Sequence, residues 1–254
     1  MIANYRLPPE IFSRTVAIDI VGCGGTGSQL LTGLARLDRC LRSLGHPGLH
    51  VTAYDPDRVS DANVGRQLFA PGDVGLAKSD VLIHRLNMWF GLGWESVPKR
   101  YEGKLPYGPL VIGCVDSAPS RIDIHEHAAR AGRLLWLDCG NDDYTGQVVF
   151  GEVDHKRKRT LPNVLDMFPE MRDPAFQAAT REEPSCSLAE SLDRQSAFIN
   201  QAIATQALSA LWLAFRTGGI DRFAWFINLR DGQTTSLKAD RATCKRYFKA
   251  AQAA

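Results

Sequence analysis

Short apolar runs alternate with longer amphipathic segments over the first 150 residues of the chain. The apolar runs cover 15–21, 49–54, 110–115 and 134–137, with a further edge strand over 95–101. Apolar residues at helical spacing fill the segments between them, over 27–44, 76–90 and 121–131. Strands that alternate with helices predict a parallel sheet covered on both faces.

The pattern changes after residue 146. A strand over 147–153 is followed by a polar segment of little periodicity over 154–187, and loops of this length are often functional. A long apolar helix over 188–216, a strand over 223–229 and a basic, helical tail from residue 239 complete the chain. We therefore predict an α/β fold, a doubly wound, Rossmann-like and mostly parallel sheet with C-terminal antiparallel strands and a long helix.

The first predicted strand ends in a glycine-rich turn, and a predicted helix follows at once. The turn contains Gly22, Gly24, Gly25 and Gly27, which gives the pattern G-x-G-x-x-G. Glycines let the backbone turn tightly and approach a phosphate, and the helix N-terminus supplies N–H donors. This context favours a nucleotide site, with a turn that binds no ligand as the alternative. The motif alone does not distinguish NAD, FAD and ATP.

Charged and amide side chains follow the next predicted strands. The second strand ends at Asp55, whose carboxylate can accept hydrogen bonds from both ribose hydroxyls. The other residues of this kind are Asp57, Asn63, Arg66, Gln67, Lys78 and, at the end of the strand over 110–115, Asp116. Any one of them is more often a solvated surface group, but the set at strand ends favours a nucleotide site.

The cations in this set bear on the kind of chemistry. Hydride transfer has no need of cations beside a triphosphate. In adenylation, a substrate carboxylate attacks the α-phosphorus, and pyrophosphate leaves with its charge neutralised. Arg66 and Lys78 therefore favour adenylation, and Asp116 would hold the Mg²⁺ that bridges phosphate oxygens.

Together these residues resemble a known family. The motifs are Gly22-x-Gly24-Gly25-x-Gly27, Asp55-x-Asp57-x-Val59, Asn63-x-x-Arg66-Gln67, Lys78 and Cys114-Val115-Asp116-Ser117 with Arg121. They are similar to the ThiF/MoeB/ubiquitin-activating family over residues 14–150 and, more weakly, over 184–230. The resemblance implies that ATP and Mg²⁺ are used to adenylate the C-terminal glycine of a small ubiquitin-like or sulfur-carrier protein.

The same resemblance implies a role for each residue. Asp55 would bind ribose, Arg66 and Lys78 the phosphates, and Asp116 the magnesium. Asn63 and Gln67 would help arrange the phosphates, and Arg121 would support the turn after Asp116. Residues 1–150 would form the nucleotide-binding domain, and 151–254, with a crossover loop, the long helix and the C-terminal strands, would complete that same domain.

Finer features of the family are present in part. Leu161-Pro162-Asn163-Val164 and Pro184-Ser185-Cys186-Ser187 resemble ThiF-like proteins of the bacterial plasmid cassettes called PRTRC systems. Family members often carry zinc on two C-x-x-C pairs, which this sequence lacks, so we expect no zinc site. Many relatives are dimers in which the partner supplies an N-terminal arginine. We expect a homodimer, with Arg6 and Arg14 as equal candidates for that arginine.

Cys186 follows the long polar segment and precedes the predicted helix over 188–216. A helix N-terminus lowers a thiol pKa and favours thiolate, although Glu182 and Glu183 oppose this. In the family, a cysteine of the crossover loop often forms a covalent bond with the partner protein. Catalysis and burial as a small apolar side chain are balanced alternatives for Cys186.

Composition excludes several classes of protein. The formal net charge is +2, from 30 basic and 28 acidic residues, which favours neither nucleic acid nor a membrane as partner. The basic run over 155–159 is more often a solvated loop. The most apolar stretch, over 202–215, is shorter than the roughly 20 residues of a membrane span. Without a signal-peptide pattern or paired cysteines, we expect a cytoplasmic protein with reduced thiols.

Three functional hypotheses follow. The first is an adenylating enzyme that activates a ubiquitin-like or sulfur-carrier protein, with a later transfer to Cys186. The second is a non-catalytic nucleotide-binding scaffold in a plasmid-encoded system, since a phosphate site can bind ATP without turnover. The third is an NAD- or FAD-dependent oxidoreductase, for which the sequence offers no set of acid and base residues suited to hydride transfer.

Overall fold

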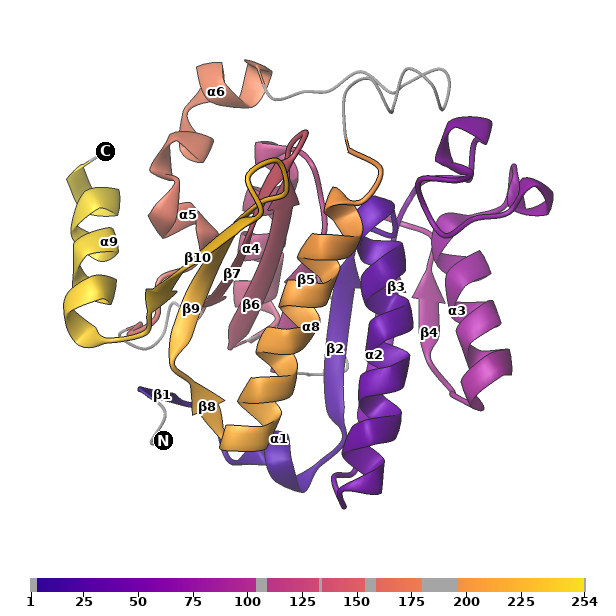
Figure 1. Cartoon of the computed structure of the whole chain (residues 1–254), viewed down its shortest axis with the longest axis horizontal. Helices are drawn as coiled ribbons and strands as arrows, with labels where there is room; N and C mark the ends of the chain where they lie inside the picture. The colour runs from indigo at the N-terminus through magenta and orange to yellow at the C-terminus, as the bar shows by residue number, and fades with distance from the viewer. Residues whose placement is uncertain (1–3, 104–108, 133, 154–158, 180–195, 254) are drawn as a thin grey trace.

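The computed structural model describes residues 4–103, 109–132, 134–153, 159–179 and 196–253. Its centre is an eight-stranded sheet with the order β10-β9-β7-β6-β5-β2-β3-β4 (Figure 1). The parallel strands are β2 (Val16–Val21), β3 (Leu49–Tyr54), β4 (Glu95–Val97), β5 (Leu110–Gly113) and β6 (Leu135–Asn141). The antiparallel strands are β7 (Thr145–Glu152), β9 (Arg222–Asn228) and β10 (Gln233–Lys238). This architecture confirms the predicted fold class.

Helices cover both faces of the sheet. One face carries α2 (Gly25–Ser43), α3 (Lys78–Phe90) and α8 (Ile199–Thr217), and Figure 1 shows α2 and α8 side by side in front of the strands. Behind the strands lies α4 (Ala118–Arg130), which contacts η3 (Pro169–Arg172) and α6 (Pro174–Ala179). The remaining elements are β1 (Tyr5–Arg6), α1 (Glu10–Ser13), η1 (Asp61–Asn63), η2 (Pro71–Asp73), α5 (Val164–Met167), β8 (Gly219–Ile220) and α9 (Arg241–Ala253).

The close packing of α2 on α8 depends on small side chains. A Cβ on Gly33 would lie 2.0 Å from a methyl carbon of Leu208, so glycine leaves room for that side chain between the two helices. Buried alanines line the opposing face of α8, at positions 204, 207, 210 and 214. The contact fixes α8 beside α2, and both helices begin at the carboxyl edge of the parallel strands.

Several predicted boundaries were wrong. The long helix begins at Ile199, because 196–198 are not helical, and 188–195 lie outside the described residues. The edge strand ends at Val97, since the chain then turns inward and buries Tyr101. The polar segment predicted as one long loop contains α5, η3 and α6 in its described part. These elements are too short to show a helical period, so the pattern of apolar residues could not reveal them.

The two segments predicted on either side of residue 150 share one sheet. The division falls within β7, which pairs with β6 on one side and β9 on the other. Apart from this large sheet, β1 pairs with β8 in a separate two-stranded sheet. No helix among the described residues is long and apolar enough to cross a membrane.

Candidate functional site

A cavity of about 550 Å³ opens at the carboxyl edge of the parallel strands. Its wall is built from residues that follow β2, β3, β5 and β6, together with the first residues of α2, α3 and α8. The chain leaves β2 and β3 toward one face of the sheet and leaves β5 toward the other. This is the topological switch point at which open α/β sheets bind ligands.

The glycine turn forms one wall of the cavity, and packing dictates two of its glycines. Gly22 has φ +95°, and a Cβ there would lie 2.4 Å from the carbonyl oxygen of Cys114. A Cβ on Gly27 would lie 1.9 Å from the carbonyl oxygen of Gly22. At Gly24, by contrast, the nearest described atom would be the Gln67 amide nitrogen at 3.9 Å. The cavity side of Gly24 is therefore open to a ligand.

The N-terminus of α2 faces this cavity without a side-chain cap. Gly24 is the N-cap residue and has no side-chain oxygen, and the first turn of α2 contains no acidic residue. The first N–H groups of a helix have no partner within the helix, and the aligned peptide dipoles add positive partial charge. The end of α2 is therefore suited to an anion such as a phosphate.

Asp55 is held in place at the end of β3. One carboxylate oxygen accepts a hydrogen bond from the backbone N–H of Cys23 (2.6 Å) and the other from that of Asp57 (2.8 Å). Burial raises the pKa of Asp55, while these two N–H groups and Lys78 oppose the rise. The carboxylate thus lies fixed beside the glycine turn, in the position that suits a ribose acceptor.

Lys78 is the first residue of α3 and is only 8% exposed. Its Nζ lies 3.3 Å from a carboxylate oxygen of Asp57, which is itself largely exposed. The N-terminus of a helix already carries positive partial charge. The Lys78 ammonium therefore adds to the positive potential at the start of α3. Arg66 lines the same cavity and is half-buried. Buried positive charge at this place suits a polyanionic ligand.

Gln67 and Asn63 take different positions in the loop after η1. Gln67 lines the cavity, and its buried Oε1 has no hydrogen-bond partner among the described residues. Asn63 is not a lining residue. Its Oδ1 accepts a hydrogen bond from the backbone N–H of Ser60, and its carbonyl oxygen accepts one from that of Gln67. Asn63 therefore shapes the loop that presents Gln67.

Asp116 is exposed to the cavity just after β5, and Arg121 holds the turn behind it. The Arg121 guanidinium donates to the carbonyl oxygen of Asp116 (3.0 Å) and to both carboxylate oxygens of Asp138 (3.1 and 3.2 Å). Burial raises the pKa of Asp138, and the Arg121 charge opposes that rise. This buried ion pair supports the Asp116 turn, as the sequence predicts for Arg121.

Comparison with known proteins decides the family. The family model described as "ThiF family" matches residues 13–246. The chain belongs to the ThiF family. Ubiquitin-like modifier-activating enzyme 5 of Mus musculus is 31% identical over 145 residues, which is 50% of this chain and 34% of the relative. The enzyme of the same name from Oryza sativa subsp. japonica is 27% identical over 146 residues, 50% of this chain and 32% of the relative. The chain thus spans about a third of the length of these relatives.

Solved structures agree with this ThiF-family fold. E. coli MccB crystallised with ATP superposes with a TM-score of 0.60 at 16% identity, over 90% of this chain and 66% of MccB. A crystal structure of PaaA gives a TM-score of 0.60 at 14% identity, over 88% of this chain and 64% of PaaA. At such identities the likeness concerns the fold alone.

Several polar residues at the cavity of this ThiF-family chain were missed from the sequence, among them a hydrogen-bonded group of three. Thr26, Asn141 and Asn200 come from α2, β6 and α8. The Thr26 hydroxyl lies 2.9 Å from Oδ1 of Asn200 and 3.1 Å from Oδ1 of Asn141. Asn200 is the one polar member of the buried residues of α8, but Gln201 and Thr205 are polar in the same turns, so the sequence gave no signal that singled it out.

The remaining residues singled out from the sequence are either outside the described part of the chain or not among the predicted ligands of the cavity. Cys186 falls in 180–195, outside the described residues, as do residues 155–158 of the basic run. Arg6 lies in β1 and Arg14 just before β2, and neither lines the cavity of its own chain. Burial raises the pKa of Cys23 well above the ordinary value, and the hydrogen bond with Cys139, followed by burial, does the same to the pKa of Cys114.

Proposed function

We propose that this protein uses ATP and Mg²⁺ to adenylate the C-terminal carboxylate of a small ubiquitin-like or sulfur-carrier protein. The observation that supports this most is the gathering of Arg66, Lys78, Asp55 and Asp116 around the open glycine turn, in one cavity. Relatives named ubiquitin-like modifier-activating enzymes point to the substrate class. A structural neighbour crystallised with ATP points to the nucleotide.

Each residue has a part in the proposed reaction. Asp55 would accept hydrogen bonds from the ribose hydroxyls, and the α2 N–H groups would bind phosphate oxygens. When the carboxylate attacks the α-phosphorus, negative charge builds up on the departing pyrophosphate. Arg66 and Lys78 would stabilise that charge, and preorganised cations in a partly buried site act more strongly than in water.

The residues at Asp116 fit a magnesium ion. Mg²⁺ in nucleotide sites is bound by one or two carboxylates, with substrate phosphates and waters as its other ligands. Asp116 offers one exposed carboxylate on a rigid turn, and the described residues hold no cluster of three or more acidic, histidine or cysteine side chains. Asp116 would hold the Mg²⁺, which would supply positive charge to offset that of the phosphates.

The proposal extends to partners and to Cys186. In a second step, the Cys186 thiolate would attack the acyl carbonyl and AMP would leave, giving a thioester. A homodimer would let Arg6 or Arg14 of one protomer reach the site of its partner. The similarity of 161–164 and 184–187 to PRTRC proteins supports a role in a plasmid-encoded system.

ATP–pyrophosphate exchange tests the proposal. The protein is mixed with Mg²⁺ and ubiquitin-fold proteins that end in Gly-Gly, including any encoded beside its gene. We expect exchange that depends on the partner and falls at least 100-fold in Arg66→Ala and Asp116→Ala, of the order found when one transition-state charge contact is removed. Arg39→Ala, which removes an exposed arginine of α2, is the control and should match wild type.

The other outcomes are equally informative. ATP binding without exchange for any partner would favour the non-catalytic scaffold. Binding of NAD or FAD in place of ATP would refute the proposal and favour the oxidoreductase. A non-reducing gel of wild type against Cys186→Ala tests the covalent step, which requires a reducible adduct that the variant lacks.

A further inference from the structure

The C-terminal helix α9 carries a concentrated positive charge on its outer side. Figure 1 shows α9 beyond β10, at one end of the large sheet. Over residues 238–249 the formal net charge is +4, whereas the whole chain carries +2, so the rest of the chain carries −2. The basic residues of this stretch are all exposed, and they are Lys238, Arg241, Lys245, Arg246 and Lys249.

The opposite side of α9 is fixed on the fold. Cys244 is 3% exposed, and the ring of Tyr247 meets that of Phe223 edge to face, with 6.0 Å between the ring centroids. The Arg159 guanidinium lies over the ring of Phe248, 5.3 Å from its centroid. Because these contacts hold the apolar side of α9 inward, the basic side chains are presented to solvent.

The stability of the helix does not account for this charge. Arg241, Lys245 and Lys249 follow one another at four-residue intervals, and like charges at this spacing weaken a helix. None of the three forms an ion pair with an acidic residue in the described part of the chain. Arg241 is also the first residue of α9, where the helix dipole disfavours a cation. The row thus costs helix stability and suits an anionic partner.

The surroundings of this row favour an acidic protein over a nucleic acid. The aromatic rings of α9, Tyr247 and Phe248, pack inward, so they offer no platform on which bases could stack. The net negative charge outside 238–249 also provides no broad positive field of the kind that nucleic-acid-binding domains present. A short, exposed row of cations is complementary to an acidic patch on a folded partner.

The position of α9 suits a small protein with a C-terminal tail. In the sheet order, five strand spacings separate β10 from β2 and its glycine turn, roughly 24 Å at about 4.8 Å each. A domain of about 100 residues has a radius of gyration of about 13 Å. An extended tail of about seven residues spans 24 Å. The body of such a partner can therefore rest on α9 while its C-terminus enters the nucleotide cavity.

We propose that the basic face of α9, formed by Arg241, Lys245 and Lys249, docks an acidic surface of the ubiquitin-like or sulfur-carrier protein that is adenylated. This inference rests on the proposed adenylation and assigns where its protein substrate is held. Exposed charge pairs are individually weak and are screened by salt, but they speed encounter and orient the partner. The basic face therefore acts on the KM for the protein substrate and leaves the chemistry at the α-phosphorus unchanged.

ATP–pyrophosphate exchange with charge-reversed variants tests the docking. The probe is the ubiquitin-fold protein ending in Gly-Gly that supports exchange by wild type. In the double variant Lys245→Glu with Lys249→Glu, we expect its KM to rise about tenfold at low salt, with the maximal rate and the KM for ATP unchanged. The rise should shrink to less than about threefold in high salt, where charges are screened. Arg36→Glu with Arg39→Glu reverses two exposed arginines of α2 and should match wild type.

The outcomes separate the docking from the function beneath it. If no ubiquitin-fold protein supports exchange by wild type, the proposed adenylation fails, and the docking fails with it. If exchange occurs and the KM is unchanged in the α9 double variant, or rises equally in the α2 control, α9 is not the docking surface. Should the glutamates impair folding, Lys245→Ala with Lys249→Ala decides in the same way, with a smaller rise.

A labelled DNA duplex of about 20 base pairs, followed by fluorescence anisotropy, tests the other kind of occupant. We expect the α9 double variant and the α2 control to bind the duplex equally weakly. Duplex binding that is lost only in the α9 variant, with an unchanged KM for the ubiquitin-fold protein, would assign the basic face to nucleic acid and overturn the proposal.

Discussion

Gly24 and Gly27 lie three residues apart in the glycine turn, and their Cβ positions meet different surroundings. A methyl group on Gly27 would collide with the Gly22 carbonyl, whereas one on Gly24 would reach only the Gln67 amide at 3.9 Å. Gly27 is therefore required by packing. Gly24 borders the space that a ligand would fill.

Alanine should therefore mainly reduce stability at position 27 and mainly reduce ATP binding at position 24. Gly27→Ala should lower the free energy of unfolding by about 1–3 kcal/mol, as overpacking in a core does. Gly24→Ala should cost less stability but weaken ATP binding. Urea unfolding and calorimetric titration with ATP measure the two quantities. Equal loss of stability in both variants would contradict this distinction.

Arg121 and Asp138 form a buried pair whose partners depend on each other. Arg121→Met would leave the Asp138 carboxylate buried without its cation, a change that typically costs about 3–5 kcal/mol. It would also free the Asp116 carbonyl and loosen the turn. We expect a lower urea midpoint and weaker Mg²⁺-dependent ATP binding. In the double variant Arg121→Met with Asp138→Leu, much of the stability should return while the weak ATP binding persists.

At this scale, the sequence predicted the glycine turn, Asp55, Arg66, Lys78 and Asp116 as a group, and the structure brings these to one cavity. The glycine turn, Asp55 and Asp116 follow strands with a clear apolar pattern, Lys78 begins a patterned helix, and Arg66 was added by its motif with Asn63 and Gln67. Asn200 lies about 60 residues beyond Asn141 along the chain, inside the helix predicted as long and apolar. Only the packing of α8 on α2 brings it to Gly25, and no local pattern encodes that contact.

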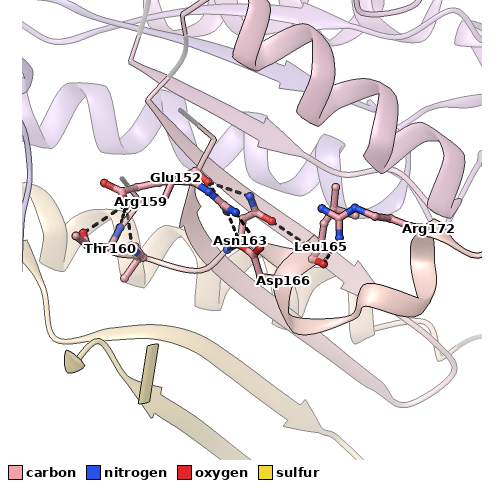
Figure 2. Close-up of polar contacts among 8 residues, drawn as sticks. Glu152, Arg159, Thr160, Asn163, Leu165, Asp166 and Arg172 are labelled. Carbon is pink, nitrogen blue, oxygen red and sulfur yellow. Dashed lines mark hydrogen bonds and ion pairs between the residues drawn. The ribbon is translucent and has the colours of Figure 1, made fainter. Parts of the chain in front are cut away.

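The segment after β7 is fixed by a network of polar contacts (Figure 2). Arg159 forms a two-pronged ion pair with Asp166, which also accepts the backbone N–H of Asn163. Asn163 caps α5 and donates from its side chain to the carbonyl of Glu152, the last residue of β7. A four-residue helix has little stability of its own, so these side chains hold α5 in place.

A double-mutant cycle measures how much the ion pair of Arg159 with Asp166 contributes to the stability of the fold. Arg159→Ala and Asp166→Ala should each lower the free energy of unfolding, and their coupling should be about 1–3 kcal/mol because both side chains are largely buried. Unfolding in urea gives the free energies of unfolding of the wild type, the two single variants and the double variant. Arg172→Ala, which removes a single hydrogen bond to the Leu165 carbonyl, is a control and should not couple to Asp166. Additive effects of Arg159 and Asp166 would mean that the pair contributes nothing specific.

Element boundaries followed the sequence where an apolar period lasted for several turns. The strand predicted over 49–54 agrees with β3, and the helix predicted over 76–90 ends with α3 at Phe90. Short elements held by side chains, such as α5, had no such period. Their positions depend on partners like Arg159 and Asp166, which a one-dimensional pattern cannot reveal.

Across the whole molecule, the cavity joins elements from almost every part of the chain, so a ligand bound there should stabilise the entire fold. ATP with Mg²⁺ at about 100 times its Kd adds roughly 2.7 kcal/mol, which corresponds to a rise in Tm of about 5–10 °C for a chain of this size. NAD at the same concentration should give a smaller rise, and Lys78→Ala should abolish the ATP effect. Differential scanning fluorimetry measures all three. A larger shift with NAD would overturn the choice of nucleotide.

The overall fold was predictable because strands and helices alternate with strong periods through the first half of the chain. The order of the strands in the sheet was not. β7 lies between β6 and β9, and β5 lies beside β2, through contacts that link distant parts of the chain. That arrangement comes from the structure, which also supplies the particular side chains.

The contact of Asn200 with Gly25 also bears on the order in which the molecule can assemble. β2 pairs with β5 across a long separation, from Ile18 to Leu110, and the glycine turn is completed only when α8 packs on it. Contacts between such distant residues form late, because a large loop must close first. During synthesis, the first two hundred residues emerge before the nucleotide turn acquires its last neighbour. A nascent chain would therefore gain its full affinity for nucleotide only after α8 has been synthesised and packed, and ATP would favour the finished fold over its partly folded precursors.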